Sequence, residues 1–344
     1  MLAAKPLVSS KPSSSKRAAR QQVAVRASAD GKYDDYKPTR AIFFPGQGAQ
    51  SVGMCKSLVE EVPRAAEMFD TASDILGYDL LKKCVEGPAE ELNTTEISQP
   101  AIYVASLAAV EKLKLEKGAD FVDGVDVTCG LSLGEYTALA FAGAFSFEDG
   151  LKLVATRGKA MQAAADAAPS AMASVIGLDS AKVEELCAAA NAEVDPDQAV
   201  QIANFLCPGN YAVSGGVAGI EKVAEMAKPQ FKARMAVKLA VAGAFHTQFM
   251  QPAVGQLEEA LAATAISEPR LPVISNVDAK PHADPEEIRK ILARQVVGPV
   301  LWENTLKELF ARGLTEGYEC GPGKVISGIA KRIDKGVSVT NVEA

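Results

Sequence analysis

A serine at position 132 lies where a buried strand turns directly into a helix, and this junction constrains the fold most strongly. The apolar-rich run at 125–129 predicts a buried strand, and the G-x-S-x-G run at 130–134 follows it. An alanine-rich helix is then expected to continue to about Ala142. A second strand, at 41–44, also ends in a tight turn, at Pro45. Strands that alternate with helices in this way predict an α/β protein with a parallel sheet.

The pattern changes after Pro169, where short strands and two helices follow one another in β-α-β-β-α-β order. This order is typical of a ferredoxin-like α+β unit. We therefore predict a larger α/β-hydrolase-like body with a parallel sheet, formed by 40–169 and 241–340, and a smaller inserted ferredoxin-like subdomain, formed by 170–240. The helices expected in the body are 54–61, 64–76, 98–117, 147–167, 252–264, 286–297, 302–312 and 324–333. The helix at 98–117 is expected to open at Ser98 and Pro100.

The N-terminal segment 1–29 differs in composition from the rest of the chain. It contains six basic residues, six serines and no acidic residue, and it has no apolar core typical of a secretory signal. Such a composition predicts an organelle transit peptide, here for the chloroplast stroma, with a disordered tail as the alternative. The polar residues 30–39 are expected to form a linker.

Charge and cysteine content exclude several classes of protein. Removing the six positive charges of residues 1–29 changes the formal net charge from −7 to −13, which argues against nucleic-acid binding. The chain has no apolar stretch long enough for a transmembrane helix, so no membrane association is expected. Its six cysteines are scattered and are interpreted as reduced thiols. With only two histidines and no cysteine pair, no metal site is predicted.

The chemistry of an exposed serine explains the spacing of the 130–134 motif. A sharp turn presents the Ser132 hydroxyl at the edge of a sheet, and the helix that follows offers the Leu133 N–H to a developing oxyanion. The alternative is that Ser132 is a helix N-cap, with Glu135 three residues later completing a capping box.

A glycine-flanked glutamine, Gln47, follows the strand predicted at 41–44 and is a candidate for the second oxyanion donor through its backbone N–H. A plain turn or a phosphate cradle would be the alternatives, although no lysine follows the loop as it does in a phosphate-binding loop. The general base of a serine nucleophile is most often histidine. His246 comes directly after a predicted strand, whereas His282 lies in a proline-rich turn that is expected to be exposed. No acidic third partner is evident, so a backbone carbonyl could orient His246 instead.

Arg157 lies on the helix after the serine helix and could pair with a carboxylate through its planar fork of donors. A surface arginine is the ordinary alternative. Two basic clusters are candidate docking patches for an acidic partner, or else simply solvated faces. They consist of Lys232, Arg234 and Lys238, and of Lys331, Arg332 and Lys335.

Taken together, these motifs resemble the malonyl-CoA:acyl carrier protein transacylase family, from about Ala41 to Val339. The motifs that carry the resemblance are 44–50, 87–93, 99–101, 130–136, 157–162, 243–246 and 321–324. The resemblance implies that Ser132 is acylated, that His246 is its base, and that Gln47 and Leu133 bind the oxyanion. It further implies that Arg157 pairs with the malonyl carboxylate, that the Gln295 carbonyl orients the histidine, and that Asn204 lies near the site.

Two positions depart from the family pattern. Leu131 stands where many members have histidine before the serine, and Leu206 lies in the segment where many have asparagine. The resemblance implies a ping-pong transfer of malonate from malonyl-CoA to the phosphopantetheine of an acyl carrier protein, for fatty acid synthesis. It implies a monomer without a bound cofactor. A serine hydrolase, a transferase of neutral acyl groups and a catalytically silent carrier-binding subunit are the alternatives.

Overall fold

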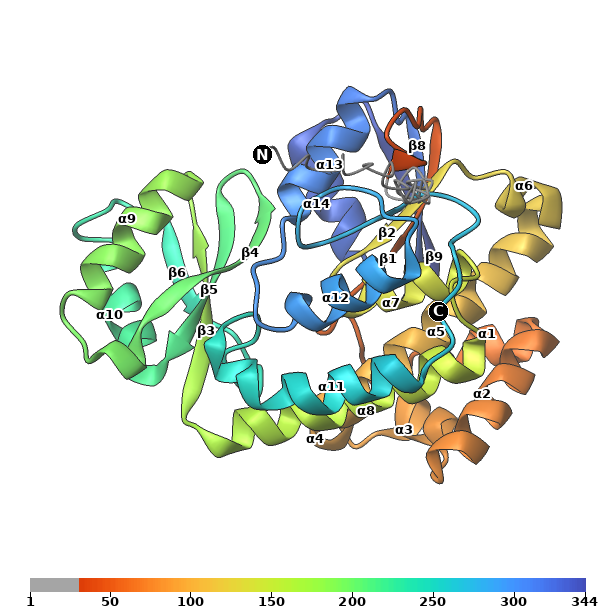
Figure 1. Ribbon diagram of the computed structural model, residues 1–344, viewed down its shortest axis with the longest axis horizontal. Coiled ribbons are helices and arrows are strands. Elements are labelled where there is room, and N and C mark those ends of the chain that lie inside the picture. Colours follow the sequence, from red (N-terminus) through yellow and green to blue (C-terminus); the bar gives the residue numbers. More distant parts are fainter. Residues whose placement is uncertain (1–30) are drawn as a thin grey trace, which may run out of the picture.

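The computed structural model describes residues 31–344, and these form a larger body and a smaller subdomain around two separate sheets (Figure 1). The predicted transit peptide at 1–29 lies outside the described residues. Within 31–344, no helix combines the length and the apolar character needed to cross a bilayer. All six cysteines are buried free thiols in the structure.

The body is built on a five-stranded sheet in which every neighbouring pair of strands is parallel. Its strands, in spatial order, are β7 (Val273–Ile274), β2 (Val127–Gly130), β1 (Arg40–Phe44), β8 (Glu316–Gly321) and β9 (Ser338–Glu343). The parallel sheet confirms the predicted α/β body. The edge strand β9 was not predicted, because its alternating polar sequence lacks the apolar run by which the other strands were found.

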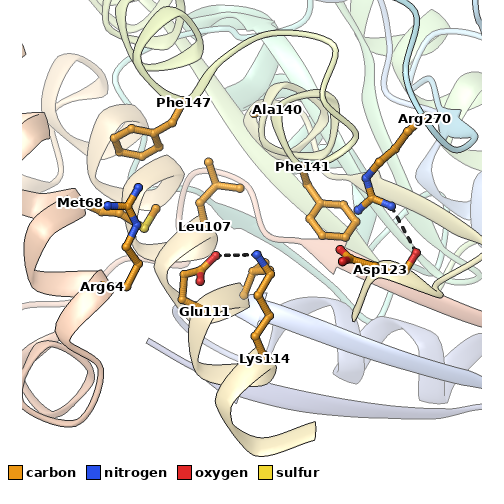
Figure 2. A pocket seen from close by; sticks show the side chains of 11 residues that line it. Arg64, Met68, Leu107, Glu111, Lys114, Asp123, Ala140, Phe141, Phe147 and Arg270 are labelled. Atoms are coloured by element: carbon orange, nitrogen blue, oxygen red, sulfur yellow. Dashed lines mark hydrogen bonds and ion pairs between the residues drawn. The ribbon is translucent and has the colours of Figure 1, made fainter. Parts of the chain in front are cut away.

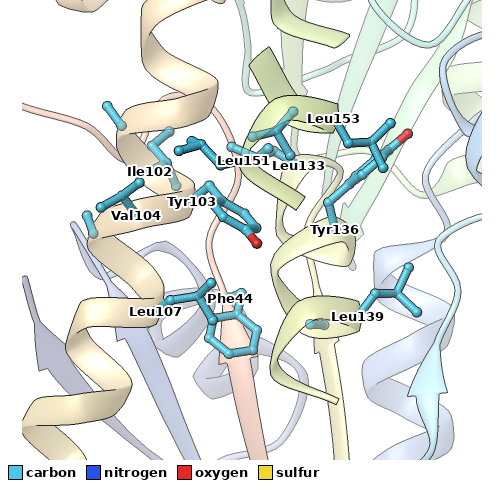
Figure 3. Packing of buried hydrophobic residues seen from close by; sticks show 14 of the residues in the cluster. Phe44, Ile102, Tyr103, Val104, Leu107, Leu133, Tyr136, Leu139, Leu151 and Leu153 are labelled. Atoms are coloured by element: carbon cyan, nitrogen blue, oxygen red, sulfur yellow. The ribbon is translucent and has the colours of Figure 1, made fainter. Parts of the chain in front are cut away.

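Helices cover both faces of this sheet, and the central strand β1 is buried from Ala41 to Phe44 as a result. Ile42 and Phe44 belong to one core cluster, and Ala41 and Phe43 to another. Figure 3 shows Phe44 packed among apolar side chains of α5 (Thr95–Lys117), α7 (Leu133–Phe141) and α8 (Phe147–Ala167). On the other face, Phe43 meets Trp302 edge-on at 6.4 Å between ring centroids. That face is covered by α13 (Trp302–Ala311) and α14 (Val325–Ile333).

The helix predicted at 98–117 begins earlier, at Thr95, so the prediction that Ser98 and Pro100 open it is wrong. Pro100 instead lies inside the helix. The start is fixed by a tertiary contact, because the Thr95 N–H donates to the side chain of Gln162 at 2.9 Å. The remaining helices of the body are α1 (Lys56–Glu61), α2 (Pro63–Leu76), α3 (Leu80–Glu86), α4 (Ala89–Leu92), α6 (Ala119–Asp123), α11 (Gln251–Ala263) and α12 (Pro285–Gln295).

The small subdomain is an antiparallel sheet with two helices on one face. Its strands are β3 (Ser170–Ile176), β4 (Val200–Cys207), β5 (Asn210–Gly216) and β6 (Met235–Lys238), in the spatial order β4-β5-β3-β6. The helices α9 (Ser180–Asn191) and α10 (Val217–Ala227) pack on it with their own core. This arrangement confirms the predicted ferredoxin-like unit.

The small sheet and the segment before β1 are each attached to the body by a local backbone contact. The β4 residue Asn204 forms a parallel bridge with Val300, so an edge of the small sheet is joined to the body. In the predicted linker, the N–H and the hydroxyl of Thr39 each donate to the Asp126 carboxylate at 2.8 Å. The end of this segment is therefore held against the body by hydrogen bonds.

Candidate active site

The serine at 132 has a backbone conformation that few residues other than glycine adopt, with φ 52° and ψ −101°. The flanking glycines make this turn possible because there is no room for side chains. A Cβ on Gly130 would lie 2.1 Å from the backbone of Gly134, and a Cβ on Gly134 would lie 2.2 Å from the carbonyl oxygen of Phe44. The turn therefore packs tightly against the central strand, and strain of this kind is concentrated at functional sites.

The capping-box alternative for Ser132 is wrong. The Ser132 side chain makes no capping hydrogen bond, and Glu135 points elsewhere. The Glu135 carboxylate accepts from the backbone N–H of Asn276 at 3.0 Å and from Nε2 of Gln295 at 2.7 Å. Burial raises the pKa of Glu135 to about 7. Glu135 thus belongs to a buried polar network beneath the serine rather than to the helix terminus.

Ser132 and His246 lie within hydrogen-bonding distance, with 2.9 Å between Oγ and Nε2. On the other side of the ring, Nδ1–H donates to the carbonyl oxygen of Gln295 at 2.8 Å. This bond fixes the tautomer that leaves Nε2 free to accept the serine proton. Burial, and then the nearby Arg157 charge, lower the pKa of His246 to about 4. The imidazole is therefore neutral near pH 7, as a general base must be.

Arg157 is 1% exposed and reaches the serine from α8. Its guanidinium donates to Gln99 at 2.6 Å, to the Gln295 side chain at 3.0 Å and to the Ser132 Oγ at 3.0 Å. Its Nε has no hydrogen-bond partner, and no carboxylate within residues 31–344 forms an ion pair with it. Burial lowers its pKa. A buried cation that lacks a counter-ion has an unused capacity to bind an anion.

The backbone around Ser132 supplies N–H groups suited to an oxyanion. Leu133 is the first residue of α7, so its N–H has no acceptor within the helix. Its side chain lies in the core (Figure 3) rather than in the cleft. Gln47 lines the cleft beside Ser132, and its side-chain amide donates to the Thr95 hydroxyl at 3.3 Å. That contact holds the loop near the serine.

The serine opens into a cleft of about 240 Å³ between the body and the small subdomain. The body contributes Gln47, Leu131, Ser132, Arg157 and His246, among others. The small subdomain and the segment that follows it contribute mainly apolar side chains. These are Met172, Leu206, Ala212, Leu239 and Val241, and they are joined by the polar Asn204. Of the predicted site residues, the structure thus places Asn204 in the wall opposite the serine. The departures Leu131 and Leu206 also face this cleft.

A second pocket, of about 270 Å³, lies away from this cleft between α2, α5 and the end of α7 (Figure 2). Its charged groups are largely satisfied, because Lys114 pairs with Glu111 and Arg270 stacks on Phe141. It contains none of the predicted site residues. His282, which was expected to be exposed, has only 14% of its side chain exposed and pairs with Asp278 at 2.9 Å. Neither residue lines the cleft.

Sequence reasoning missed three residues that hold the site together: Gln99, Glu135 and Asn276. The Asn276 side chain accepts from the Ser132 N–H at 2.6 Å and donates to the Gly130 carbonyl at 2.8 Å. Glu135 was noted only as a possible capping residue. Asn276 lies 144 positions from Ser132 in the sequence, and no local signal links the two. Within residues 31–344, no cluster of side chains is arranged to hold a metal ion.

Comparison with known proteins places this geometry in a defined class. The acyl transferase domain family matches residues 42–332. The Malonyl CoA-acyl carrier protein transacylase of Bacillus subtilis is 41% identical over 295 residues, which cover 86% of this chain and 90% of that protein. The solved malonyl CoA-acyl carrier protein transacylase of Coxiella burnetii is 36% identical, with a TM-score of 0.84 over 89% of this chain and 95% of that one.

A third relative was solved as a complex of a type II PKS acyl-carrier protein with its malonyl-transacylase. It is 36% identical, with a TM-score of 0.82 over 88% of this chain and 95% of that chain. The fold and the serine–histidine site therefore define an acyltransferase. More specifically, this chain belongs to the malonyl-CoA–acyl carrier protein transacylase family.

Proposed function

We propose that this enzyme transfers a malonyl group from malonyl-CoA to the phosphopantetheine thiol of an acyl carrier protein, through an ester on Ser132. The observation that carries this proposal is the buried Arg157, which lacks an acidic partner and lies 3.0 Å from the Ser132 Oγ. The free carboxylate of a malonyl group is the counter-ion that this cation lacks. A guanidinium binds a carboxylate with two parallel hydrogen bonds, and burial strengthens the pairing.

In the first half of the reaction, Ser132 attacks the thioester carbonyl while its proton moves to Nε2 of His246, 2.9 Å away. The backbone N–H groups of Gln47 and Leu133 stabilise the oxyanion of the tetrahedral intermediate. The intermediate collapses by breaking the C–S bond, and the coenzyme A sulfur leaves with the proton held by His246. The malonyl group remains as an ester on Ser132, with its carboxylate on Arg157.

In the second half, the thiol of the carrier arm gives its proton to His246 and attacks the ester carbonyl. The C–O bond breaks, and the Ser132 oxygen recovers the proton. Hydrolysis would waste the ester, so water must be kept from it. The apolar side chains around the cleft, including Met161, Leu206 and Phe245, limit the access of water to the acyl group.

Two rival activities make different demands on the cleft. A serine hydrolase needs an activated water and no buried cation. A transferase of neutral acyl groups would leave Arg157 desolvated without a counter-ion, which is costly. Both rivals therefore leave Arg157 unexplained. A silent carrier-binding subunit leaves the Ser132–His246 hydrogen bond unexplained.

The test is the intact mass of the protein after incubation with malonyl-CoA or with acetyl-CoA. Wild type is expected to gain one malonyl group, and Ser132→Ala none. Arg157→Ala should lose malonyl loading far more than acetyl loading. Rapid release of free malonate without an adduct would support a hydrolase instead. Equal loading of wild type by both thioesters would exclude Arg157 as the determinant of specificity.

We further propose that the enzyme acts as a monomer in the plastid stroma, without a bound cofactor. The basis for the location is the basic, acid-free composition of residues 1–29. Fusing residues 1–40 to a fluorescent protein in plant cells tests it, and a cytosolic signal would contradict it. Light scattering on the protein that lacks this segment tests the monomer.

A further inference from the structure

The short strand β7 ends before the turn that carries the serine. Its two residues pair with β2 at Thr128 and Cys129. The chain then bends away, and the Ser275 N–H donates to the Lys280 carbonyl at 2.9 Å. The backbone groups of the turn at 130–132 therefore lie beyond the end of β7. A buried peptide group without a partner is costly, so another group has to take the place of the strand on this side.

The side chain of Asn276 takes that place. It is 0% exposed. Its Oδ1 accepts from the Ser132 N–H at 2.6 Å, and its Nδ2 donates to the Gly130 carbonyl at 2.8 Å. A peptide N–H can only donate and a carbonyl can only accept, so only this orientation of the amide satisfies both groups. The side chain thus continues the hydrogen bonding of β7 across the strand-to-helix turn.

The backbone of Asn276 is itself held from two directions. Its N–H donates to the Glu135 carboxylate at 3.0 Å, and its carbonyl accepts from the Leu301 N–H at 2.8 Å. The same carboxylate accepts from the side chain of Gln295, whose carbonyl orients His246. One buried network therefore fixes the positions of both the nucleophile and its base.

The conformation of Ser132 depends on such support. Its φ of 52° and ψ of −101° are unfavourable for a residue with a side chain, and they persist only where the surrounding structure holds them. In this conformation Oγ lies 2.9 Å from Nε2 of His246. A turn that relaxed would move Oγ away from the imidazole. A displacement of about 1 Å at a reacting atom can lower a rate about 10²-fold.

We propose that Asn276 is a positioning residue that holds Ser132 in its reactive conformation during both halves of the reaction. Asn276 does not line the cleft, so it acts through the turn and not on the substrates. It also occupies the N–H of Ser132, which leaves the N–H of Leu133 for the oxyanion. This inference rests on the proposed role of Ser132 as the nucleophile. Its loss should slow the chemistry without weakening the binding of either substrate.

The main test is Asn276→Leu, which has a similar branched shape but makes no hydrogen bond. Its maximal single-turnover rate of loading from malonyl-CoA is expected to fall about 10²-fold. The half-saturating concentration of malonyl-CoA should stay within about twofold of wild type, because the cleft is unchanged. The rate at which phenylmethanesulfonyl fluoride modifies Ser132 should fall by a similar factor. That probe has no carboxylate, so its reaction does not depend on Arg157.

Two further variants separate positioning from a general loss of stability. Thr128→Val removes a buried hydrogen bond of the same sheet, from the Thr128 hydroxyl to the Ile42 carbonyl at 2.9 Å, and should load at the wild-type rate. Asn276→Asp keeps the acceptor, and its carboxyl can also donate when protonated. Burial, with Glu135 and Asp278 nearby, should keep it protonated at about pH 5.5. There it should load within about threefold of wild type at the same pH.

The proposal would be overturned if folded Asn276→Leu loaded at the wild-type rate, or if Thr128→Val were equally slow. It would also be overturned if Asn276→Asp were as slow as Asn276→Leu at about pH 5.5, or if only the half-saturating concentration changed. Circular dichroism at each pH shows that the compared proteins are folded. Wild type that is sulfonylated at Ser132 but never loaded by malonyl-CoA would instead refute the proposed function, and the sulfonylation rates would still test Asn276.

Discussion

The two walls of the catalytic cleft are built on different principles. On the body side, Ser132, His246, Arg157, Gln295 and Glu135 form one continuous hydrogen-bonded network. On the side of the small subdomain the lining is mainly apolar. Its one amide, that of Asn204, makes no side-chain hydrogen bond within residues 31–344.

This difference separates chemistry from access. Each polar group of the body wall is oriented by its neighbours before substrate arrives, which is what electrostatic stabilisation of a transition state requires. Gln295 is central, because its carbonyl orients His246 while its side chain contacts Arg157 and Glu135. The opposite wall supplies shape and excludes water. Substitutions in the body wall are therefore expected to have larger effects than substitutions across the cleft.

Replacing His246 by alanine should have the largest effect, because it removes the base that receives the Ser132 proton. Loading from malonyl-CoA is expected to fall by about 10⁴-fold or more. The measurement is the single-turnover rate of adduct formation by mass spectrometry. His282→Ala removes the chain's other histidine, which lies outside the cleft, and should load at the wild-type rate. A His246→Ala enzyme within tenfold of wild type would contradict the assigned base.

Arg157→Met should lower malonyl loading by about 10²-fold, since one buried ion pair with substrate is lost. The pH dependence of the loading rate tests whether the Arg157 charge also acts on His246. Burial and the Arg157 charge hold the pKa of His246 at about 4, so the wild-type rate should persist below the ordinary histidine value of 6.5. Removing the cation removes one of these causes, and the acid limb of acetyl loading should move to higher pH. An unmoved limb would show that the charge does not act on His246.

Glu135→Gln should alter stability more than activity, because an amide oxygen can still accept from Asn276 and Gln295. In the unfolded chain Glu135 loses its proton near pH 4.5, whereas in the folded protein it keeps the proton to about pH 7. Between these values the folded state binds more protons, so this group makes wild type less stable as pH rises.

The Glu135→Gln variant has no titrating group at this position, so its stability does not fall in this way as pH rises. The difference in free energy of unfolding between the variant and wild type should therefore increase from pH 4.5 to pH 8, by up to about 3 kcal/mol. Urea unfolding at each pH measures the difference. A difference that stays constant with pH would exclude this titration.

Asn204→Ala should have the smallest effect, within about threefold on loading, because the Asn204 side chain supports no other group in the cleft. A loss as large as that of Arg157→Met would show that the small subdomain takes part in the chemistry, and would break the contrast between the two walls. Leu206→Asn provides the matching change on the same wall and should be equally mild.

The local motifs were sufficient to predict the class of fold and the central residues. The strand–turn–helix around Ser132 and the β-α-β-β-α-β order of residues 170–240 both depend on residues close together in sequence. The predicted start of α5 was wrong because it depends on a distant residue: the Thr95 N–H donates to Gln162, 67 positions away. The supporting residues Gln99 and Asn276 could not be predicted, because their roles depend on contacts across the fold.

By itself the sequence determined the parallel α/β body and the inserted subdomain, and it singled out Ser132 as the proposed nucleophile and His246 as its proposed base, because periodicity, glycine spacing and the scarcity of histidine can be read without the fold. Only the tertiary structure decided that Glu135 supports Gln295 rather than a helix cap, and that Arg157 is buried without a counter-ion. Burial and pairing are properties of groups brought together from distant positions, and only the folded chain defines them.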